Sequence, residues 1–484
     1  MNSPIRRLAA VITVLFASLF ISVTYIQVVS AASLEDNARN TRSLTKERSR
    51  QRGQILAGSK VIASSEPSDD VYKYLRSYSS GAMYAPVTGY YSVRGNSTGL
   101  EGAENEYLSG SSDELFIRNL TNLLTGEQPS GATVQTTINP KAQKAAWDAL
   151  GDQRGAVIAL NPKTGEILAM VSRPSYNPNS LAEHDTDKAL DSYAKLNADD
   201  LEPLLNRTIN QLYPPGSTFK LVTSAAALSS GEYSADSSDG LIGDAIITLP
   251  GTSTTLKNDT NAPCADGSPT LTEALVESCN TTYAQLGIDL GEEAMSEQAS
   301  KFGFGQDLTI PQRVTESIFS DGALADSYLG QSSIGQYNVR TTPLQVAMIA
   351  AGIANDGVVM RPNLVKKVTS ADGKTVSEPG AEELSEAVTP EVAEELTEMM
   401  KAVVQNGTGT NAQISGVEVA GKTGTAQNAE GAAPHAWFTS FAPADDPQVA
   451  VAVVVESGGK AGNEAWGGTV AAPIAKAVME AVIK

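Results

Sequence analysis

Histidine and cysteine are almost absent from this sequence, which has two of each in 484 residues. The histidines, His184 and His435, stand far apart, and the cysteines, Cys264 and Cys279, lack the spacing of metal ligands. A zinc enzyme needs several such ligands, and a Ser-His-Asp hydrolase needs a histidine that works with an acid. The composition therefore argues against both classes, and it gives no reason to expect a metal or a diffusible cofactor.

Positive charge is also scarce. Lysine and arginine together number 35, against 55 aspartates and glutamates, so the formal net charge is −20. A nucleic-acid partner requires a basic surface that neutralises phosphates, and we expect no such partner here. The length exceeds that of one ordinary domain, and the apolar fraction of 41% is typical of a chain that folds around a large core.

Charged residues are missing altogether between Leu8 and Val29. This run is long enough to cross a bilayer as a helix, and Arg6 and Arg7 before it predict that the N-terminus stays in the cytoplasm. A cleaved signal peptide is the alternative, because the segment 30–32 offers small residues at a cleavage position. We expect an uncleaved anchor, and thus a single-pass protein of the cell membrane whose remaining chain is extracytoplasmic.

Export from the cytoplasm permits Cys264 and Cys279 to form a disulfide. Their separation in the sequence allows this bond but does not demand it. Two free thiols are an equal alternative at this point.

Composition divides the chain into three parts. Residues 1–32 form the cytoplasmic tip and the membrane anchor, residues 33–130 form a small mixed domain, and residues 131–484 form the main domain. In the small domain, Arg52 to Ala63 predicts a pair of strands around a turn at Gly58 and Ser59, and Asp113 to Leu124 suggests the one helix.

The main domain begins and ends with predicted strands and has a helical block between them. This order favours an α+β fold, in which the two ends of the chain meet in one antiparallel sheet with helices packed on it. The expected strands are Thr133–Thr137, Gly155–Leu160, Glu166–Val171, Val417–Ala420 and Val449–Glu456. The expected helices are Asn139–Leu150, Leu271–Leu290, Pro343–Ala354, Pro390–Gln405 and Ala472–Ile483.

The stretch Tyr213-Pro-Pro-Gly-Ser-Thr-Phe-Lys220 stands before a further apolar helix that ends near Gly231. Residues three apart share one face of a helix, so Ser217 and Lys220 would point into the same space. A lysine amine in that place can take the proton of the serine hydroxyl. We therefore expect Ser217 to be an acylated nucleophile and Lys220 to be its base.

A serine–lysine acyl-transfer enzyme also carries S-x-N and K-T-G patterns. Each pattern is weak alone: S-x-x-K occurs at Ser43, Ser192, Ser217 and Ser457, S-x-N at Ser175 and Ser278, and K-T-G at Lys163 and Lys422. Context separates them. Only Ser217 opens an apolar helix, and only Lys422 begins a candidate core strand, whereas Lys163 lies at a hairpin tip.

With Ser217, Ser278 and Lys422 chosen, the chain resembles a class B penicillin-binding protein, a membrane-anchored peptidoglycan transpeptidase. The resemblance covers about residues 131–480 and extends more weakly to an N-terminal domain without catalytic residues. It rests on further runs around the three motifs, namely Asn206-Arg207, Ser333-Ile-Gly-Gln336, Thr341-Thr-Pro-Leu-Gln-Val-Ala347, Asn406-Gly-Thr-Gly409, Ala420 to Gln427, Arg52-Gly-Gln-Ile55 and Gly99-Leu-Glu101. The run 435–438 resembles actinobacterial members.

The resemblance implies a role for each motif residue. Ser217 attacks the carbonyl of a D-Ala-D-Ala stem peptide, and Lys220 takes its proton, which requires a lowered lysine pKa. Ser278 passes the proton to the departing D-alanine. The substrate is held by Asn280 at its amide, by Lys422 and Thr423 at its carboxylate, and by the backbone around Gly424, with the Ser217 and Thr425 N–H groups on the oxyanion. An acceptor amine then closes the cross-link.

Other enzymes share these motifs. A D,D-carboxypeptidase, a serine β-lactamase and a β-lactam sensor or scaffold without turnover are the alternatives. The anchor and the extra N-terminal domain favour the transpeptidase, with a role in cell-wall synthesis and division and with β-lactams as covalent inhibitors. Its implied partners are peptidoglycan stem peptides, the cytoplasmic membrane and a polymerase of lipid-linked glycan. We do not expect a bifunctional enzyme with a glycosyltransferase, because residues 33–130 are too few to hold that domain as well.

Overall fold

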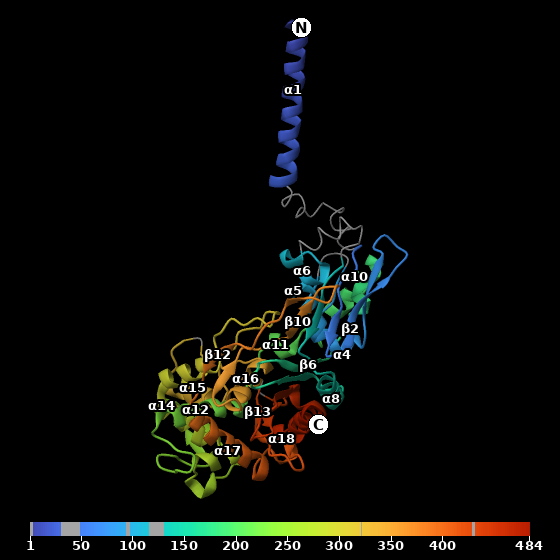
Figure 1. The fold of residues 1–484 in the computed structure, drawn as a ribbon. Coiled ribbons are helices and arrows are strands. Elements are labelled where there is room, and N and C mark those ends of the chain that lie inside the picture. Colours follow the sequence, from blue (N-terminus) through green and yellow to red (C-terminus); the bar gives the residue numbers. More distant parts are fainter. Residues whose placement is uncertain (1–2, 31–48, 93–96, 116–129, 321, 428–430) are drawn as a thin grey trace.

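The computed structural model describes residues 3–30, 49–92, 97–115, 130–320, 322–427 and 431–484 (Figure 1). The chain starts with an apolar helix, α1 (Ser3–Thr24), which continues as a π-helical turn over Tyr25–Val29. The region Ser3–Val28 is long and apolar enough to cross a membrane, and none of it is buried against the rest of the protein. The expected helix is therefore present, and it begins before the uncharged run. Most of the expected stalk after it lies outside the described residues.

A six-stranded sheet forms the small domain. Its order is β11-β10-β4-β1-β2-β3. The strands are β1 (Ile55–Ala57), β2 (Lys60–Pro67), β3 (Tyr74–Tyr78), β4 (Thr133–Thr136), β10 (Val365–Thr369) and β11 (Thr375–Ser377). The predicted strand pair around the Gly58 turn is confirmed, because β1 and β2 pair antiparallel. Strands β4, β10 and β11 come from beyond residue 130, so chain from both sides of that residue builds this sheet.

Three short helices accompany the sheet: α4 (Gly81–Thr88), α5 (Gly99–Ala103) and α6 (Asn105–Ser109). The expectation of a single helix in this domain was wrong. These segments are rich in residues of low helical propensity, and α4 even contains Pro86. Their burial against the sheet stabilises them instead. Of the expected helix at Asp113–Leu124, residues 113–115 are helical and 116–124 lie outside the described residues.

A cluster of buried charged side chains connects segments of the small domain to one another. The Glu101 carboxylate accepts hydrogen bonds from Arg52 Nε and Arg76 Nε, each at 2.6 Å, and all three side chains are buried. Burial alone would raise the pKa of Glu101, but the charges of Arg76 and Arg52 outweigh it and hold that pKa below its usual value. The charge triad therefore connects two of the runs that resemble the family, 52–55 and 99–101.

The main domain has a five-stranded antiparallel sheet with the order β13-β14-β15-β5-β6. Its strands are β5 (Gly155–Leu160), β6 (Ile167–Arg173), β13 (Ala420–Ala426), β14 (His435–Ala442) and β15 (Val449–Val455). The first and last strands thus meet in one sheet, which confirms the predicted α+β fold. Strand β13 begins three residues later than the expected start at Val417 and runs through the K-T-G motif. Strand β14 was not predicted, since all its side chains are buried and its pattern does not alternate.

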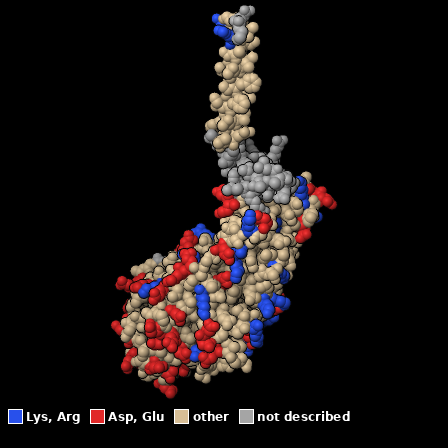
Figure 2. Space-filling view, in the orientation of Figure 1, with Lys and Arg blue, Asp and Glu red and all other residues tan. Residues whose placement is uncertain are grey.

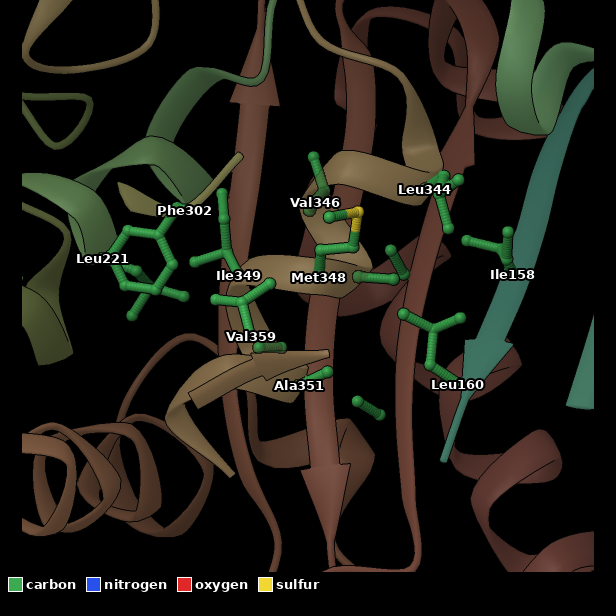
Figure 3. Close-up of a cluster of buried hydrophobic side chains, with 14 of the residues drawn as sticks. Ile158, Leu160, Leu221, Phe302, Leu344, Val346, Met348, Ile349, Ala351 and Val359 are labelled. Atoms are coloured by element: carbon green, nitrogen blue, oxygen red, sulfur yellow. The ribbon is translucent and has the colours of Figure 1, made fainter. Parts of the chain in front are cut away.

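Helices cover both faces of this sheet. On one face lie α8 (Pro140–Leu150) and the C-terminal helix α19 (Ala472–Ile483), close to their predicted ranges. On the other lies α16 (Pro343–Ile353). Figure 3 shows Leu344 of α16 beside Ile158 and Leu160 of β5, and Ile349 on the side of Phe302 and Leu221. This helix is therefore the buried centre of the domain, between the sheet and the helical block.

The helical block carries the motif residues. It contains α12 (Lys220–Ser230), α13 (Leu271–Glu277), α14 (Asn280–Lys301), α15 (Asp326–Ser332) and α17 (Pro390–Asn406). The single helix expected over Leu271–Leu290 is two helices, because Ser278 has a left-handed backbone conformation (φ 62°) that ends α13. Figure 2 shows acidic side chains spread over this part of the molecule. In α17, four glutamates are exposed: Glu391, Glu394, Glu395 and Glu398.

Smaller elements fill the connections. They are α9 (Asn179–Ala182), α10 (Thr186–Asn197), α11 (Arg207–Asn210), α18 (Gly467–Val470), the hairpin of β7 (Ile246–Thr248) with β8 (Thr255–Lys257), the pair of β9 (Val358–Met360) with β12 (Glu383–Glu386), and the 3₁₀ turn η2 (Gly216–Phe219). The turn η2 lies directly against β13 and leads into α12.

Candidate active site

Ser217 lies in the 3₁₀ turn η2, and Lys220 is the first residue of α12. Side chains three residues apart eclipse each other in a 3₁₀ turn, so this backbone is compatible with the expected common direction of the two side chains. Both residues are buried. Gly216 makes this turn possible, since its φ is +54° and a Cβ there would lie 2.7 Å from the carbonyl oxygen of Thr425. The glycine therefore lets the serine turn approach β13 closely.

The amine of Lys220 has two acceptors. Its Nζ donates to the carbonyl oxygen of Ser278 at 2.7 Å and to Oδ1 of Asn280 at 2.8 Å. A neutral amine has two N–H groups, so these two bonds use them both and leave its lone pair free to accept a proton. The hydroxyl of Ser278 lies 3.4 Å from the same nitrogen. Among the described residues, the Ser217 hydroxyl has no hydrogen-bond partner.

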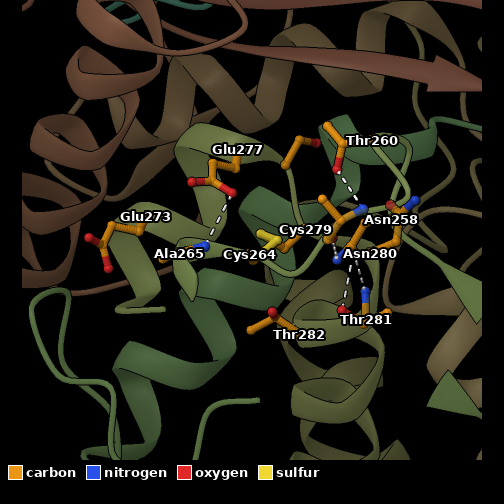
Figure 4. Close-up of a disulfide and its surroundings, with 12 residues drawn as sticks. Asn258, Thr260, Cys264, Ala265, Glu273, Glu277, Cys279, Asn280, Thr281 and Thr282 are labelled. Atoms are coloured by element: carbon orange, nitrogen blue, oxygen red, sulfur yellow. Dashed lines mark hydrogen bonds between the residues drawn. A yellow bond between two sulfur atoms is a disulfide. The ribbon is translucent and has the colours of Figure 1, made fainter. Parts of the chain in front are cut away.

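The turn from α13 to α14 presents Ser278 and Asn280. Ser278 ends α13 in its left-handed conformation, and Cys279 is the N-cap position of α14. The structure joins Cys279 to Cys264 in a disulfide, with the two Cα atoms 6.2 Å apart (Figure 4). A capping box at the start of α13 and a disulfide at its end thus fix this short helix on both sides.

Lys422 reaches the same place from β13. Its Nζ donates to the Ser278 hydroxyl at 2.8 Å and to the Thr423 carbonyl oxygen at 3.1 Å, and the residue is completely buried. The hydroxyl of Thr423 in turn lies 2.6 Å from the hydroxyl of Thr408. Gly424 packs on the serine turn, because a Cβ there would lie 2.9 Å from Thr218 Cγ2. All eight predicted site residues are therefore brought together around η2, β13 and the α13–α14 turn: Ser217, Lys220, Ser278, Asn280, Lys422, Thr423, Gly424 and Thr425.

Burial changes the ionisation of both lysines. It lowers the pKa of Lys220 well below the usual value, and the charge of Lys422 lowers it further. Burial also lowers the pKa of Lys422, to about 7. The nearby Asp259 acts in the opposite direction on both. Burial thus favours the neutral amine at both positions, and at Lys220 the positive charge of Lys422 favours it further.

The chemistry of such a site is acyl transfer by a serine with an amine base. The comparisons with known proteins agree. Residues 155–480 match the family model described as "Penicillin binding protein transpeptidase domain", and residues 52–134 match "Penicillin binding protein A dimerisation domain". The chain belongs to the penicillin-binding protein transpeptidase family.

Individual relatives of this penicillin-binding protein cover its whole length. It is 46% identical to the peptidoglycan D,D-transpeptidase PbpA of Mycolicibacterium smegmatis, over 100% of this chain and 99% of the relative. It is 44% identical to PbpA of Mycobacterium tuberculosis, with the same coverage. The solved structure of penicillin-binding protein A from M. tuberculosis as a ceftriaxone acyl-enzyme matches 91% of this chain and 100% of the other, with a TM-score of 0.88.

These findings confirm the predicted family and activity. The chain is a peptidoglycan D,D-transpeptidase of the class B type, and its family is acylated by β-lactams. Peptidoglycan is its substrate. The N-terminal apolar helix is compatible with a single-pass membrane anchor.

Two aromatic groups beside the penicillin-binding site are structural. Trp437 is fully buried, and its Nε1 donates to the carbonyl oxygen of Pro214 at 3.1 Å. His435 is buried, and its Nδ1 accepts a hydrogen bond from the Ser457 N–H. Burial lowers the pKa of His435, so it is neutral at neutral pH. Both rings pack edge-on against Tyr213, which places the start of the serine loop.

Sequence reasoning gave no role to several residues that support the site. The hydroxyl of Tyr213 donates to Glu456 at 2.7 Å, and Glu456 also binds the buried Arg207 at 2.8 Å. Thr408 contacts Thr423, and Asp259 accepts from Asn280. Tyr213, Arg207 and Thr408 lay in runs that resembled the family. Glu456 and Asp259 carried no signal, because each meets the site through contacts distant in sequence.

Among the described residues, one group has the spacing of possible metal ligands. This cluster of possible ligands, Cys264, Cys279 and Glu277, has its two sulfur atoms bound to each other.

Proposed function

We propose that Ser217 is the nucleophile of this transpeptidase and that Lys220 is its general base. One observation carries the proposal: two buried lysines, both with a lowered pKa, meet at the hydroxyl of Ser278. A neutral lysine can accept a proton, whereas a charged lysine binds an anion. The pair thus provides both functions that the donor half-reaction requires.

In acylation, the Ser217 oxygen attacks the carbonyl carbon of the penultimate D-alanine. Its proton moves to the lone pair of Lys220, whose two N–H groups are held by Ser278 and Asn280. Ser278 then passes a proton from Lys220 to the nitrogen of the departing D-alanine. The C–N bond breaks, and the shortened stem peptide remains as an ester on Ser217.

The terminal carboxylate of the donor, its amide and the oxyanion that forms during the reaction are bound by different groups. Lys422 and the Thr423 hydroxyl bind the terminal carboxylate, and its negative charge raises the pKa of Lys422 so that the ammonium form prevails. Asn280 binds the donor amide, and the strand at Gly424 supports the peptide backbone. The N–H groups of Ser217 and Thr425 stabilise the oxyanion, in keeping with the close approach of η2 to β13.

An amine of a second stem peptide resolves the ester and forms the cross-link. If water resolved the ester instead, the enzyme would be a D,D-carboxypeptidase. An analysis of the products must therefore distinguish the cross-linked peptide from the shortened one. A sensor or scaffold would stop at the acyl-enzyme.

The setting in the cell extends the proposal. Helix α1 anchors the enzyme in the cytoplasmic membrane. Arg6 and Arg7, near the start of this helix, lie on the inside, and the catalytic domain lies outside. The functional division is residues 1–32 for the anchor, 33–130 for the N-terminal domain and 131–484 for catalysis. A polymerase of lipid-linked glycan is the partner that supplies strands to cross-link.

The test uses the full-length chain in detergent. A fluorescent penicillin should label the wild type, and peptide mapping should find the adduct on Ser217. Ser217→Ala should lose the label, while Ser175→Ala, in the S-x-N look-alike, should keep it. Labelling of Ser217→Ala would remove Ser217 as the nucleophile. With a stem-peptide donor and an acceptor amine, mass spectrometry should detect the cross-linked product; the shortened peptide alone would mean carboxypeptidase activity.

A further inference from the structure

An exposed carboxylate stands at the active site without a part in the reaction described so far. Asp259 follows strand β8, and its Oδ1 accepts a hydrogen bond from Nδ2 of Asn280 at 3.0 Å. Asn280 is the residue that also accepts from Lys220. Asp259 is therefore one side chain away from the base and is open to solvent.

The position of Asp259 is fixed by its neighbour Asn258. That side chain is buried and donates to the carbonyl oxygens of Asp244 and Ala262. Its Oδ1 accepts from the N–H of Thr281, in the first turn of α14. Figure 4 shows Asn258 next to Asn280 and Thr281. These bonds tie the segment to the helix that presents Asn280 and hold the backbone of Asp259 beside the site.

Both N–H groups of the Asn280 amide have acceptors, and its oxygen keeps one lone pair for the donor. One N–H donates to the Lys257 carbonyl oxygen at 3.1 Å, the other to Asp259, and Oδ1 accepts from Lys220. An amide oxygen in place of the Asp259 carboxylate would still accept this hydrogen bond. The negative charge of Asp259 is therefore not needed to orient Asn280.

The charge does act on the interior of the site. Among the described residues, Asp259 is the one carboxylate that raises the pKa values of both Lys220 and Lys422 against the effect of burial. The other groups that meet at this point are the two lysines themselves. Asp259 accordingly places a negative charge beside the two positive charges that Lys220 and Lys422 can carry.

We propose that Asp259 binds the ammonium form of the acceptor amine and so determines the preference of the enzyme for a cationic acceptor. The inference rests on the proposed roles of Ser217, Lys220 and Asn280. An alkyl amine has a pKa of about 10 and arrives as a cation. It would be repelled by Lys422, and a carboxylate at the solvent side of the site offsets that repulsion and raises the local concentration of the amine.

The step that follows balances in protons. The bound ammonium gives one proton to water and becomes the free amine. Its nitrogen attacks the ester carbon, the new C–N bond forms, and the bond to the Ser217 oxygen breaks. The second proton leaves the nitrogen through Lys220 and returns to the Ser217 oxygen. The products are the cross-linked amide and the free enzyme.

The experiment compares the full-length wild type with Asp259→Asn, Asp259→Ala and the control Asp266→Asn, which changes an exposed carboxylate in the same segment. An N-acyl-D-alanyl thioester serves as the donor. The acceptors are Nα-acetyl-lysine amide, a cation at neutral pH, and hydroxylamine, which is uncharged there. Acylation by penicillin is measured separately, because it reports only the half-reaction in which Ser217 becomes acylated.

For Asp259→Asn we expect aminolysis by the lysine derivative to fall about threefold to tenfold, the effect of one partly screened charge. At neutral pH the reaction with hydroxylamine and the acylation rate should change less than about twofold, because the hydrogen bond to Asn280 is kept and the loss of the negative charge lowers the pKa of Lys220 further, which keeps this base neutral. Added salt should reduce the wild-type preference for the cation. Asp259→Ala should additionally slow acylation, and Asp266→Asn should behave as the wild type.

An equal loss with both acceptors, or no loss with either, would overturn the proposal. Equal loss would make Asp259 only a positioning residue for Asn280. A wild type that penicillin does not acylate at Ser217 would instead contradict the proposed function, so the two failures are distinguishable.

Discussion

The ammonium group of Lys422 donates a hydrogen bond to the hydroxyl of Ser278 at 2.8 Å, across a separation of 144 residues in the sequence. The amine of Lys220 lies 3.4 Å from the same oxygen. The Ser278 oxygen thus accepts from Lys422 and faces Lys220, and its own proton remains available to the leaving group. This arrangement connects the proposed base to the leaving group and holds the two amines apart.

Removal of the Ser278 hydroxyl should slow acylation by about 10²-fold to 10³-fold, the usual contribution of a proton relay. Ser278→Ala and Ser278→Gly should lose activity alike, since both lack the oxygen. Their stabilities should differ, because alanine in the left-handed conformation costs about 1 kcal/mol and glycine does not. Stopped-flow acylation and thermal unfolding measure the two effects. Full activity in the glycine variant would show that only the backbone at this position matters.

Thr408 is expected to position the Thr423 hydroxyl through their 2.6 Å contact. Thr408→Val keeps the shape and removes the hydrogen bond. The affinity for a donor with a free terminal carboxylate should fall about twofold to tenfold, and a donor that is amidated at that end should be affected much less. Thr410→Val, a change on the same loop, is the control. Equal effects on both donors would refute this role.

The bond between Cys264 and Cys279 should stabilise the protein by about 2–3 kcal/mol, as expected for a disulfide that closes a loop of this length. Cys264→Ser with Cys279→Ser should lower the unfolding temperature. Acylation should slow as well, because Cys279 stands between Ser278 and Asn280. Unchanged kinetics with reduced stability would mean that the turn keeps its shape without the bond.

Glu101→Gln should destabilise the N-terminal domain by about 3–5 kcal/mol, since it leaves Arg52 and Arg76 as buried charges without their carboxylate. The pKa of Glu101 is lowered in the folded protein, so its contribution is complete above the unfolded value of about 4.3 and is lost as the pH falls through the folded value. Chemical unfolding at neutral and acidic pH tests both points. Exposed Glu106→Gln is the control, and equal stability of the two variants would contradict the expected effect.

The sequence predicted the site far better than it predicted the N-terminal domain. Ser217 and Lys220 are neighbours in the chain, so local helical geometry was sufficient to place them together. Lys422 stood out because its motif begins a strand of apolar neighbours. Ser278 could be chosen by pattern, but its left-handed backbone, which splits one expected helix into two, has no signature in a serine.

Long-range pairing explains most of what was missed. Strands β10 and β11 join the sheet of the N-terminal domain from more than two hundred residues away. The sequence of Val365–Thr369 does not indicate that this strand pairs with β4. Strand β14 has no alternating pattern because both of its faces are buried. Asp259 lies in an irregular segment, and only the folded chain brings it to Asn280.

In the Lys422→Ala variant, the fall of the acylation rate at acidic pH should begin at a higher pH than in the wild type. The ammonium of Lys422 lowers the pKa of Lys220, so its removal lets that pKa rise, and the base becomes protonated at a higher pH than in the wild type. Lys422→Arg keeps the charge and should leave the onset of this fall nearly in place. The comparison of both variants over a range of pH checks the sign of this coupling, and a shift toward lower pH in Lys422→Ala would contradict it.

The most direct test of the central claim, a neutral Lys220 as the base of Ser217, is the pH dependence of penicillin acylation in the wild type. The rate constant should be near its maximum at neutral pH and fall only at lower pH, with an apparent pKa well below the usual lysine value of about 10.4. A rate that instead rises tenfold for each pH unit until about pH 10 would mean that Lys220 is charged at neutral pH, and it would contradict the mechanism.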